Sequence, residues 1–244
     1  MTGAPVLVFV HGALVRDGAW WWRPTGDLLR ERTGVDSIAV ALPSCGETDA
    51  ARGDLQADAA ALRAVLDQHD DVVLVGHSYG GTVIAEAGTH PSVRHLVLVS
   101  SYTPPVGASQ GSIMSEEPDP VAVRVDDGRV ALDGYDPASF GARFLQDGDD
   151  PTQRAAFDRT TSQAAEAFGS PTTRSGWADA ESTALVCLDD RSTTVALQRD
   201  HASRATRTVE LPTGHHPFVT RPDLVVDALE PLVDRRPPAQ ANCA

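Results

Sequence analysis

The chain has 244 residues, a length that suits one α/β domain with a large buried core. Its formal charge of -14 at pH 7 opposes binding to polyanions, so we expect neither nucleic acid nor an anionic membrane as a partner. Three widely separated cysteines, Cys45, Cys187 and Cys243, argue against a disulfide framework. No basic segment or long apolar run opens the chain, so we expect no signal peptide and take the cytoplasm as the default location.

The first predicted strand covers residues 6–10, an apolar run that fits a strand buried on both faces. His11, Gly12 and Ala13 follow as a loop that leads toward a helix opening near Trp20. We expect the backbone amide of Ala13 to point at a developing negative charge, because such amides commonly stabilise the oxyanion of acyl transfer. Gly12 would let this loop approach the reacting group closely.

Residues 72–81 form the most informative segment. An apolar β-branched run at 72–75 predicts a buried strand, Gly-His-Ser-Tyr-Gly at 76–80 predicts a sharp turn, and residues 82–87 continue as an apolar helix. This is the pattern of a nucleophile elbow with Ser78 at its tip. The flanking glycines have a steric reason, because the turn forces close backbone approach and strains the serine. The amide of Tyr79 is the second expected donor to the oxyanion.

After a predicted strand at residues 93–99 the pattern of alternating strands and helices breaks. We interpret residues 102–180 as an inserted cap, between core segments 1–101 and 181–233, and residues 234–244 as a flexible tail. Within the cap, residues 121–125 and 129–132 predict a hairpin turned by Asp127 and Gly128. Asp150 before Pro151 predicts a capped helix start. The cap's apolar pocket candidates are Phe140, Phe144, Phe157, Phe168 and Trp177.

Carboxylates and histidines follow the last two predicted strands. Asp189 and Asp190 come directly after the buried run at 183–188, and His215 and His216 lie in the loop after residues 206–211. Catalytic groups of an α/β sheet collect at this carboxyl edge. A hydroxyl nucleophile needs a base and the base needs an orienting acid, and the chain supplies both downstream of Ser78.

The other histidines have simpler explanations. His95 lies inside a predicted strand, His69 and His201 lie near helix ends, and His77 is expected to pack behind the serine. Adjacent histidines do not converge on one ion, and no Cys/His ligand spacing accompanies them. We therefore expect no metal and no cofactor.

The chain resembles the α/β hydrolase superfamily almost from end to end. Within it, the chain is similar to a bacterial esterase-like branch related to plant methyl-ester esterases and hydroxynitrile lyases. The motifs that carry the resemblance are Phe-Val-His-Gly-Ala at 9–13, Gly-Ala-Trp-Trp-Trp-Arg-Pro at 18–24, Leu-Pro-Ser-Cys-Gly at 42–46, Gly-His-Ser-Tyr-Gly-Gly at 76–81 and Gly-His-His-Pro-Phe at 214–218. Arginine without lysine and abundant alanine also indicate a GC-rich bacterial genome.

The resemblance implies a mostly parallel, doubly wound α/β sheet with an inserted cap. It favours Asp190 over Asp189 as the acid and selects His215 as the base, because the family's base precedes a small residue and Pro-Phe. The chain departs from the family's pattern in one place: it has two extra residues between Ala13 and Trp20, which put the segment 15–17 beside the expected oxyanion loop.

Several activities of this superfamily are disfavoured by chemistry. Epoxide hydrolases and haloalkane dehalogenases on this fold attack with aspartate, whereas Ser78 occupies the elbow. Hydroxynitrile lyases carry a lysine just after the catalytic histidine, whereas His216 stands here and the chain contains no lysine. The absence of lysine also excludes Schiff-base chemistry and a P-loop phosphate site.

The expected function is hydrolysis of a small or medium carboxylic ester, lactone or thioester by a monomer or homodimer acting on a small-molecule substrate. Two rival readings remain open. A cyclase or lyase of secondary metabolism would keep the same site but turn over simple esters poorly. A receptor-like binding module would bind ligand tightly and hydrolyse it slowly. The sequence does not name the substrate, because fold and motif are shared by many chemistries.

Overall fold

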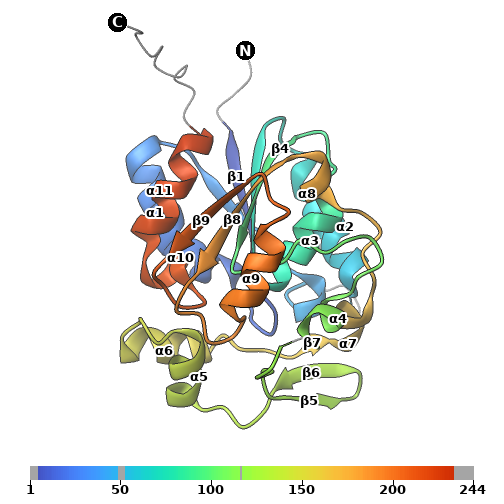
Figure 1. Cartoon of the computed structure of the whole chain (residues 1–244), viewed down its shortest axis with the longest axis vertical. Helices are drawn as coiled ribbons and strands as arrows, with labels where there is room; N and C mark the ends of the chain where they lie inside the picture. Colours follow the sequence, from blue (N-terminus) through green and yellow to red (C-terminus); the bar gives the residue numbers. More distant parts are fainter. Residues whose placement is uncertain (1–4, 49–52, 116, 234–244) are drawn as a thin grey trace, which may run out of the picture.

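A parallel sheet of six strands forms the centre of the molecule (Figure 1). The computed structural model describes residues 5–48, 53–115 and 117–233. The strand order is β2-β1-β3-β4-β8-β9, and every neighbouring pair is parallel. The strands are β1 (Val6–Val10), β2 (Ser37–Ala39), β3 (Val72–His77), β4 (Val93–Val99), β8 (Glu181–Cys187) and β9 (Arg207–Leu211). The predicted parallel α/β sheet is confirmed.

Helices cover both faces of this sheet, which explains why the inner strands β1 and β3 are apolar runs rather than alternating ones. They are α1 (Gly18–Thr33), the short 3-10 helix η1 (Pro43–Cys45), α2 (Leu55–Leu66), α3 (Tyr79–Ala87), α9 (Val195–Ala202), α10 (Pro217–Thr220) and α11 (Pro222–Val233). Among the described residues, no helix is both long and apolar enough to cross a bilayer. The predicted tail, with Cys243, lies outside the described residues, while Cys45 and Cys187 are free and buried.

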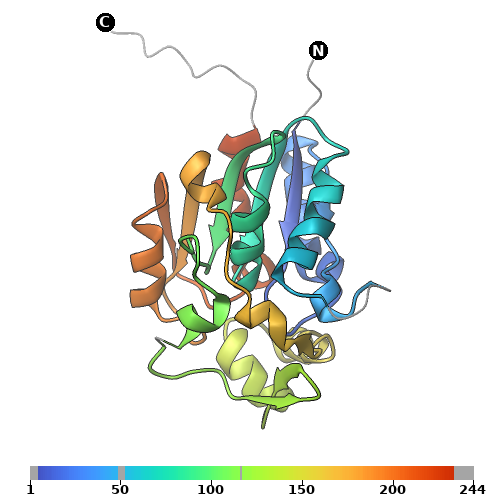
Figure 2. The same cartoon turned by 90° about the vertical axis from the view of Figure 1, so that its right-hand side faces the viewer.

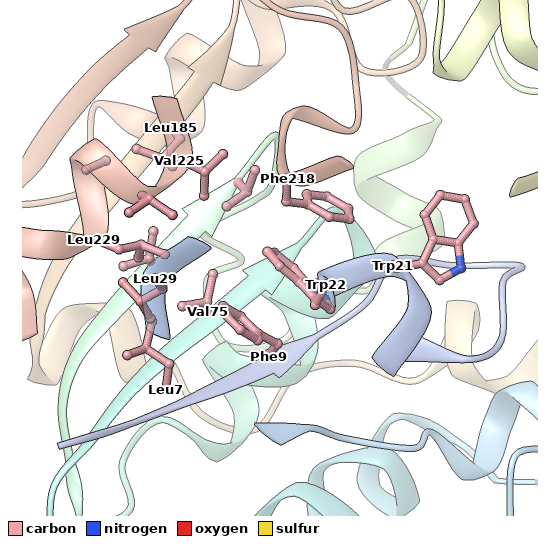
Figure 3. Close-up of a cluster of buried hydrophobic side chains, with 14 of the residues drawn as sticks. Leu7, Phe9, Trp21, Trp22, Leu29, Val75, Leu185, Phe218, Val225 and Leu229 are labelled. Atoms are coloured by element: carbon pink, nitrogen blue, oxygen red, sulfur yellow. The ribbon is translucent and has the colours of Figure 1, made fainter. Parts of the chain in front are cut away.

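Two apolar cores lie on opposite faces of the sheet. Leu7 and Phe9 belong to the core that includes side chains of α1 and α11, whereas Val8 and Val10 belong to the core on the α2 and α3 side. Successive strand residues point to opposite faces, so β1 contributes to both cores in alternation. In the first core Trp22 lies between Phe9 and Phe218, with ring centroids 4.4 and 4.0 Å away (Figure 3).

The segment between β4 and β8 lies mostly across one end of the sheet (Figures 1 and 2). Its elements are α4 (Gln110–Met114), β5 (Val123–Asp126), β6 (Arg129–Leu132), α5 (Pro137–Phe144), α6 (Asp150–Phe157), β7 (Gln163–Ala164), α7 (Ala165–Gly169) and α8 (Gly176–Asp179). Strands β5, β6 and β7 form a separate antiparallel sheet. The last helix, α8, packs back on α3, where a Cβ at Gly176 would lie 2.7 Å from Gly88 Cα.

Two local predictions in this segment have different outcomes. The β5–β6 hairpin is confirmed, and its turn residues Asp127 and Gly128 have φ of 44° and 69°. These left-handed conformations suit the Asp-Gly pair. The predicted cap of α6 is wrong by one residue: Asp149, rather than Asp150, accepts the amide hydrogen of Thr152. Either carboxylate could have capped the helix, but Asp150 is already its first residue.

Candidate active site

Ser78 occupies the turn between β3 and α3 in a conformation that few side chains adopt. Its φ of 49° and ψ of -121° mark a strained backbone of the kind found at functional sites. A Cβ at Gly76 would lie 2.6 Å from Gly80 O, and one at Gly80 would lie 2.5 Å from Val10 O. The glycines are therefore required where the elbow passes against its own backbone and the end of β1, as the sequence predicts.

His215 and Asp190 meet beside this turn, each from the loop after a neighbouring strand. His215 Nδ1 lies 2.8 Å from Asp190 Oδ2, and the two side chains are 5% and 0% exposed. Burial by itself raises the pKa of Asp190, but nearby His215 and the hydrogen bonds that the carboxylate accepts outweigh burial and lower it. Asp190 is thus an ionised acceptor for an N–H at Nδ1, which leaves Nε2 of His215 for proton transfer.

Three further residues hold the Asp190 carboxylate. The backbone amides of Ser192 and Thr193 donate to Oδ1 over 2.7 and 3.0 Å. Gln198 Nε2 donates to Oδ2 over 3.0 Å. These contacts fix the orientation of the carboxylate toward His215.

Ser100 also contacts this pair, and the sequence analysis did not select it. Its hydroxyl donates to Asp190 Oδ2 and lies 3.1 Å from His215 Nδ1. Ser100 directly follows the apolar run of β4 and has φ of 42°. Its position at a strand end, the criterion that selected the two aspartates, could have identified it.

Asp189 and His216, the alternatives to Asp190 and His215, make other contacts. Asp189 is exposed, and its backbone pairs with Thr213 and Gln146. His216 Nδ1 donates to Phe144 O over 2.9 Å, and its ring stacks on Trp21 at 4.8 Å between centroids. Burial, together with the nearby His215, lowers the pKa of His216 to about 3. Of the two adjacent histidines, His215 is therefore the one placed against a carboxylate.

Three buried imidazoles pack together at this point. One nitrogen from each of His77, His215 and His216 lies within 4.8 Å of the others. The expectation that adjacent histidines do not converge is therefore wrong for His215 and His216. Each of the three rings also has a nitrogen in contact with an oxygen: His215 Nδ1 lies 2.8 Å from Asp190 Oδ2, His216 Nδ1 lies 2.9 Å from Phe144 O, and His77 Nε2 lies 2.9 Å from the backbone oxygen of His215.

The loop after β1 passes directly over the elbow. A Cβ at Gly12 would lie 2.8 Å from His77 Nδ1 and 3.3 Å from Ser78 Cβ, so the close approach expected of this glycine is confirmed. The expected oxyanion donors, the amides of Ala13 and Tyr79, belong to the residues that directly follow Gly12 and Ser78. Neither amide has a backbone acceptor within the part of the chain that the structure describes.

The extra residues after Ala13 connect the loop to the predicted cap. Val15 forms a β-bridge with Thr160, and the amide of Arg16 donates to Arg159 O over 2.9 Å. Asp17 accepts the amide of Trp20 and so caps α1. The insertion therefore links the loop beside Ser78 to the segment that covers the sheet.

A cavity of about 360 Å³ opens onto Ser78 and His215. Its wall is mostly apolar and comes largely from the predicted cap. The apolar lining residues of the cap are Met114, Pro120, Val121, Val123, Val125, Val130, Leu132, Phe140, Phe144 and Phe168. Phe157 and Trp177, the other two aromatic candidates, do not line it: Phe157 packs on Phe140, and Trp177 Nε1 donates to Pro104 O.

Comparisons with known proteins agree with this fold. A family model described as "Alpha/beta hydrolase family" matches residues 7–228. The chain is 27% identical over 240 residues to the α/β hydrolase nvfD of Aspergillus novofumigatus, covering 91% of this chain and 94% of that protein. It is also 34% identical over 110 residues to a carbendazim hydrolyzing esterase of a Nocardioides species, covering 42% of this chain and 44% of the esterase.

Solved structures show the same architecture. A pyrethroid hydrolase from Sphingobium faniae superposes with a TM-score of 0.80 at 22% identity, covering 96% of this chain and 98% of that one. A polyneuridine aldehyde esterase variant gives 0.78 at 20% identity, covering 94% and 99%. These similarities establish the fold.

Proposed function

Because the chain belongs to the α/β hydrolase family, a hydrolase family in which it is similar to named esterases, we propose that it is a serine hydrolase. Its substrate is a small or medium carboxylic ester, lactone or thioester. The observation that carries this proposal is the 2.8 Å contact between His215 Nδ1 and Asp190 Oδ2, in the wall of the cavity that Ser78 also lines.

The reaction proceeds in two displacements. His215 Nε2 takes the proton of the Ser78 hydroxyl as Oγ attacks the carbonyl carbon, and the amides of Ala13 and Tyr79 stabilise the resulting oxyanion. The imidazolium then gives its proton to the departing alcohol or thiol, which leaves an acyl group on Ser78. A water molecule repeats the sequence and releases the acid and free serine.

Asp190 has an orienting and electrostatic role. It accepts the N–H of His215 at Nδ1, which leaves Nε2 unprotonated and ready to act as a base. Its lowered pKa keeps it ionised, so it stabilises the imidazolium that forms during each displacement. The four other hydrogen bonds to Asp190, from Ser100, Ser192, Thr193 and Gln198, hold it in this position.

The cavity indicates the general character of the substrate. Among the residues that the structure describes, its apolar wall offers no Lys or Arg to pair with a charged acyl group, since the titratable side chains there are histidines and Tyr102. Of these, burial lowers the pKa of His77 and His216 and so keeps them neutral. An uncharged, apolar acyl or alcohol group is therefore favoured.

Pre-steady-state release of p-nitrophenol from acetate, butyrate and octanoate esters tests the proposal. We expect a burst followed by sustained turnover, lost in Ser78→Ala and His215→Ala. The His216→Ala variant is the matched control, because it removes the adjacent imidazole but not the contact with Asp190, and it should keep the burst. The absence of a burst from folded wild-type protein would contradict the proposal and favour a cyclase, a lyase or a binding module instead.

A further inference from the structure

A chain of buried polar side chains lies behind the elbow, outside the groups that the proposed reaction uses. The Tyr79 hydroxyl and the Ser44 hydroxyl each donate to Asp58 Oδ2 over 2.6 Å, and the Ser44 amide donates to Asp58 Oδ1 over 2.9 Å. Gln163 Nε2 donates to Ser44 Oγ over 2.9 Å, and the Leu14 amide donates to Gln163 Oε1 over 3.0 Å. We call Asp58, Ser44 and Gln163 the buried polar relay.

The hydrogen bonds of this relay end at Tyr79 and Leu14, next to the two proposed oxyanion donors. Tyr79 supplies one of the two proposed oxyanion donors through its own amide, and its side chain ends on Asp58. Leu14 directly follows Ala13, whose amide is the other donor. The relay thus connects two loops that belong to different elements, the N-terminus of α3 and the turn after β1.

The relay is assembled from three further parts of the fold. Asp58 comes from α2, Ser44 from η1 and Gln163 from β7. All three side chains are fully buried. A buried polar side chain is costly unless its hydrogen bonds are made, whereas a fully satisfied network fixes one arrangement of its members. The relay is therefore suited to fixing the distance between the turn after β1 and the N-terminus of α3. Apolar packing alone would fix this distance less specifically.

We propose that Asp58, Ser44 and Gln163 are positioning residues that hold the amides of Ala13 and Tyr79 at the spacing a tetrahedral oxyanion requires. This proposal rests on the serine hydrolase function proposed above. Gln163 pairs with Val130 of β6, and Val130 lines the cavity. The relay therefore also links the position of the predicted cap to the spacing of the two amides.

Small substitutions test the proposal. Tyr79→Phe removes the hydroxyl that donates to Asp58, and Ser44→Ala removes one oxygen from the relay. Gln163→Met removes the side-chain hydrogen bonds to Ser44 and Leu14 with little change in length. We measure the acylation rate and the dissociation constant Kd of the same ester from the dependence of the burst rate on ester concentration, together with the affinity of an aryl trifluoromethyl ketone. The hydroxyl of Ser78 adds to this ketone and its proton passes to His215, which creates an oxyanion between the two amides.

Misplacing a reacting group by about 1 Å can cost about 10²-fold in rate. We therefore expect each variant to slow acylation about 10- to 100-fold, to lose ketone affinity by a similar factor and to keep the Kd of the ester close to the wild-type value. Thr25→Val is the control, since it removes a buried hydroxyl that donates to Phe218 O in the other core. It should lower the free energy of unfolding without weakening ketone binding.

The outcomes separate the two proposals. If wild-type protein gives a burst but folded Ser44→Ala and Tyr79→Phe acylate and bind the ketone as wild type does, the relay has no positioning role and this inference is wrong. If Gln163→Met does not fold, those two smaller substitutions decide the matter. If wild-type protein gives neither burst nor ketone adduct, the hydrolase proposal fails, and this one fails with it.

Discussion

The buried histidine beside the proposed base should make the protein sensitive to acid. His216 is 5% exposed, its Nδ1 donates to a backbone oxygen, and its ring stacks on Trp21. Burial lowers its pKa from 6.5 to about 3 in the folded protein. The unfolded chain therefore takes up a proton at this residue below pH 6.5, while the folded protein does not until about pH 3. Stability is lost as the pH falls through this window.

The size of the effect follows from the difference between the two pKa values. Each pH unit below 6.5 lowers the free energy of unfolding by about 1.4 kcal/mol, so the loss from His216 alone is about 2 kcal/mol at pH 5. His216→Phe keeps an aromatic ring against Trp21 but cannot titrate. At pH 7.5 the free energy of unfolding of the variant should be about 1 kcal/mol below that of wild type, because the hydrogen bond to Phe144 is missing. Between pH 7.5 and pH 5 the free energy of unfolding should fall by about 2 kcal/mol less in the variant than in wild type.

Urea unfolding of wild type and His216→Phe at pH 7.5 and pH 5 measures this difference directly. Trp21→Phe serves as the control, because it disturbs the same stacked pair and removes no titrating group. Its destabilisation should be equal at the two pH values. If wild type and His216→Phe lose the same stability between pH 7.5 and pH 5, His216 is not held neutral by burial and this reasoning is refuted.

Three further predictions concern the site itself. Asp190→Asn should lower kcat about 10⁴-fold by favouring the wrong histidine tautomer, whereas the exposed Asp189→Asn should stay near wild type; similar losses in steady-state ester hydrolysis would refute the assignment. Gly12→Ala should abolish most of the burst, because its Cβ would lie 2.8 Å from His77 Nδ1 and 3.3 Å from Ser78 Cβ and so displace the loop or the elbow, and a wild-type burst rate would show that the loop can move away. Val130→Trp should fill part of the cavity of about 360 Å³ and raise the acetate-to-octanoate ratio of kcat/KM; an unchanged ratio would mean that the acyl chain lies elsewhere.

The parts of the fold and site that follow local rules could be predicted from the sequence. The predicted strands that become β3, β8 and β9 are each followed by polar residues, and parallel strands bring such ends to one edge of the sheet. This is why His215 contacts Asp190 and why Ser78 and His215 line the same cavity. The glycines on either side of Ser78 follow from sterics at a sharp turn, and the same reasoning identified Gly12.

Contacts between distant segments could not be predicted. Leu14 and Gln163 are 149 positions apart, and no periodicity connects a glutamine in a short cap strand to a loop after the first strand. Asp58 reads in the sequence as one more polar residue of an amphipathic helix, although its side chain is fully buried. Its partners Ser44 and Tyr79 are identified only by the packing of η1 and α3 against α2.

The most direct test of the account is to locate the acyl group. Wild-type protein is mixed with p-nitrophenyl butyrate, quenched in acid during the burst, digested and analysed by mass spectrometry. We predict one butyryl group on the peptide that contains Ser78, present at the burst time and absent in Ser78→Ala. An adduct on another residue, or a burst with no acylated peptide, would contradict the proposal that Ser78 is the nucleophile.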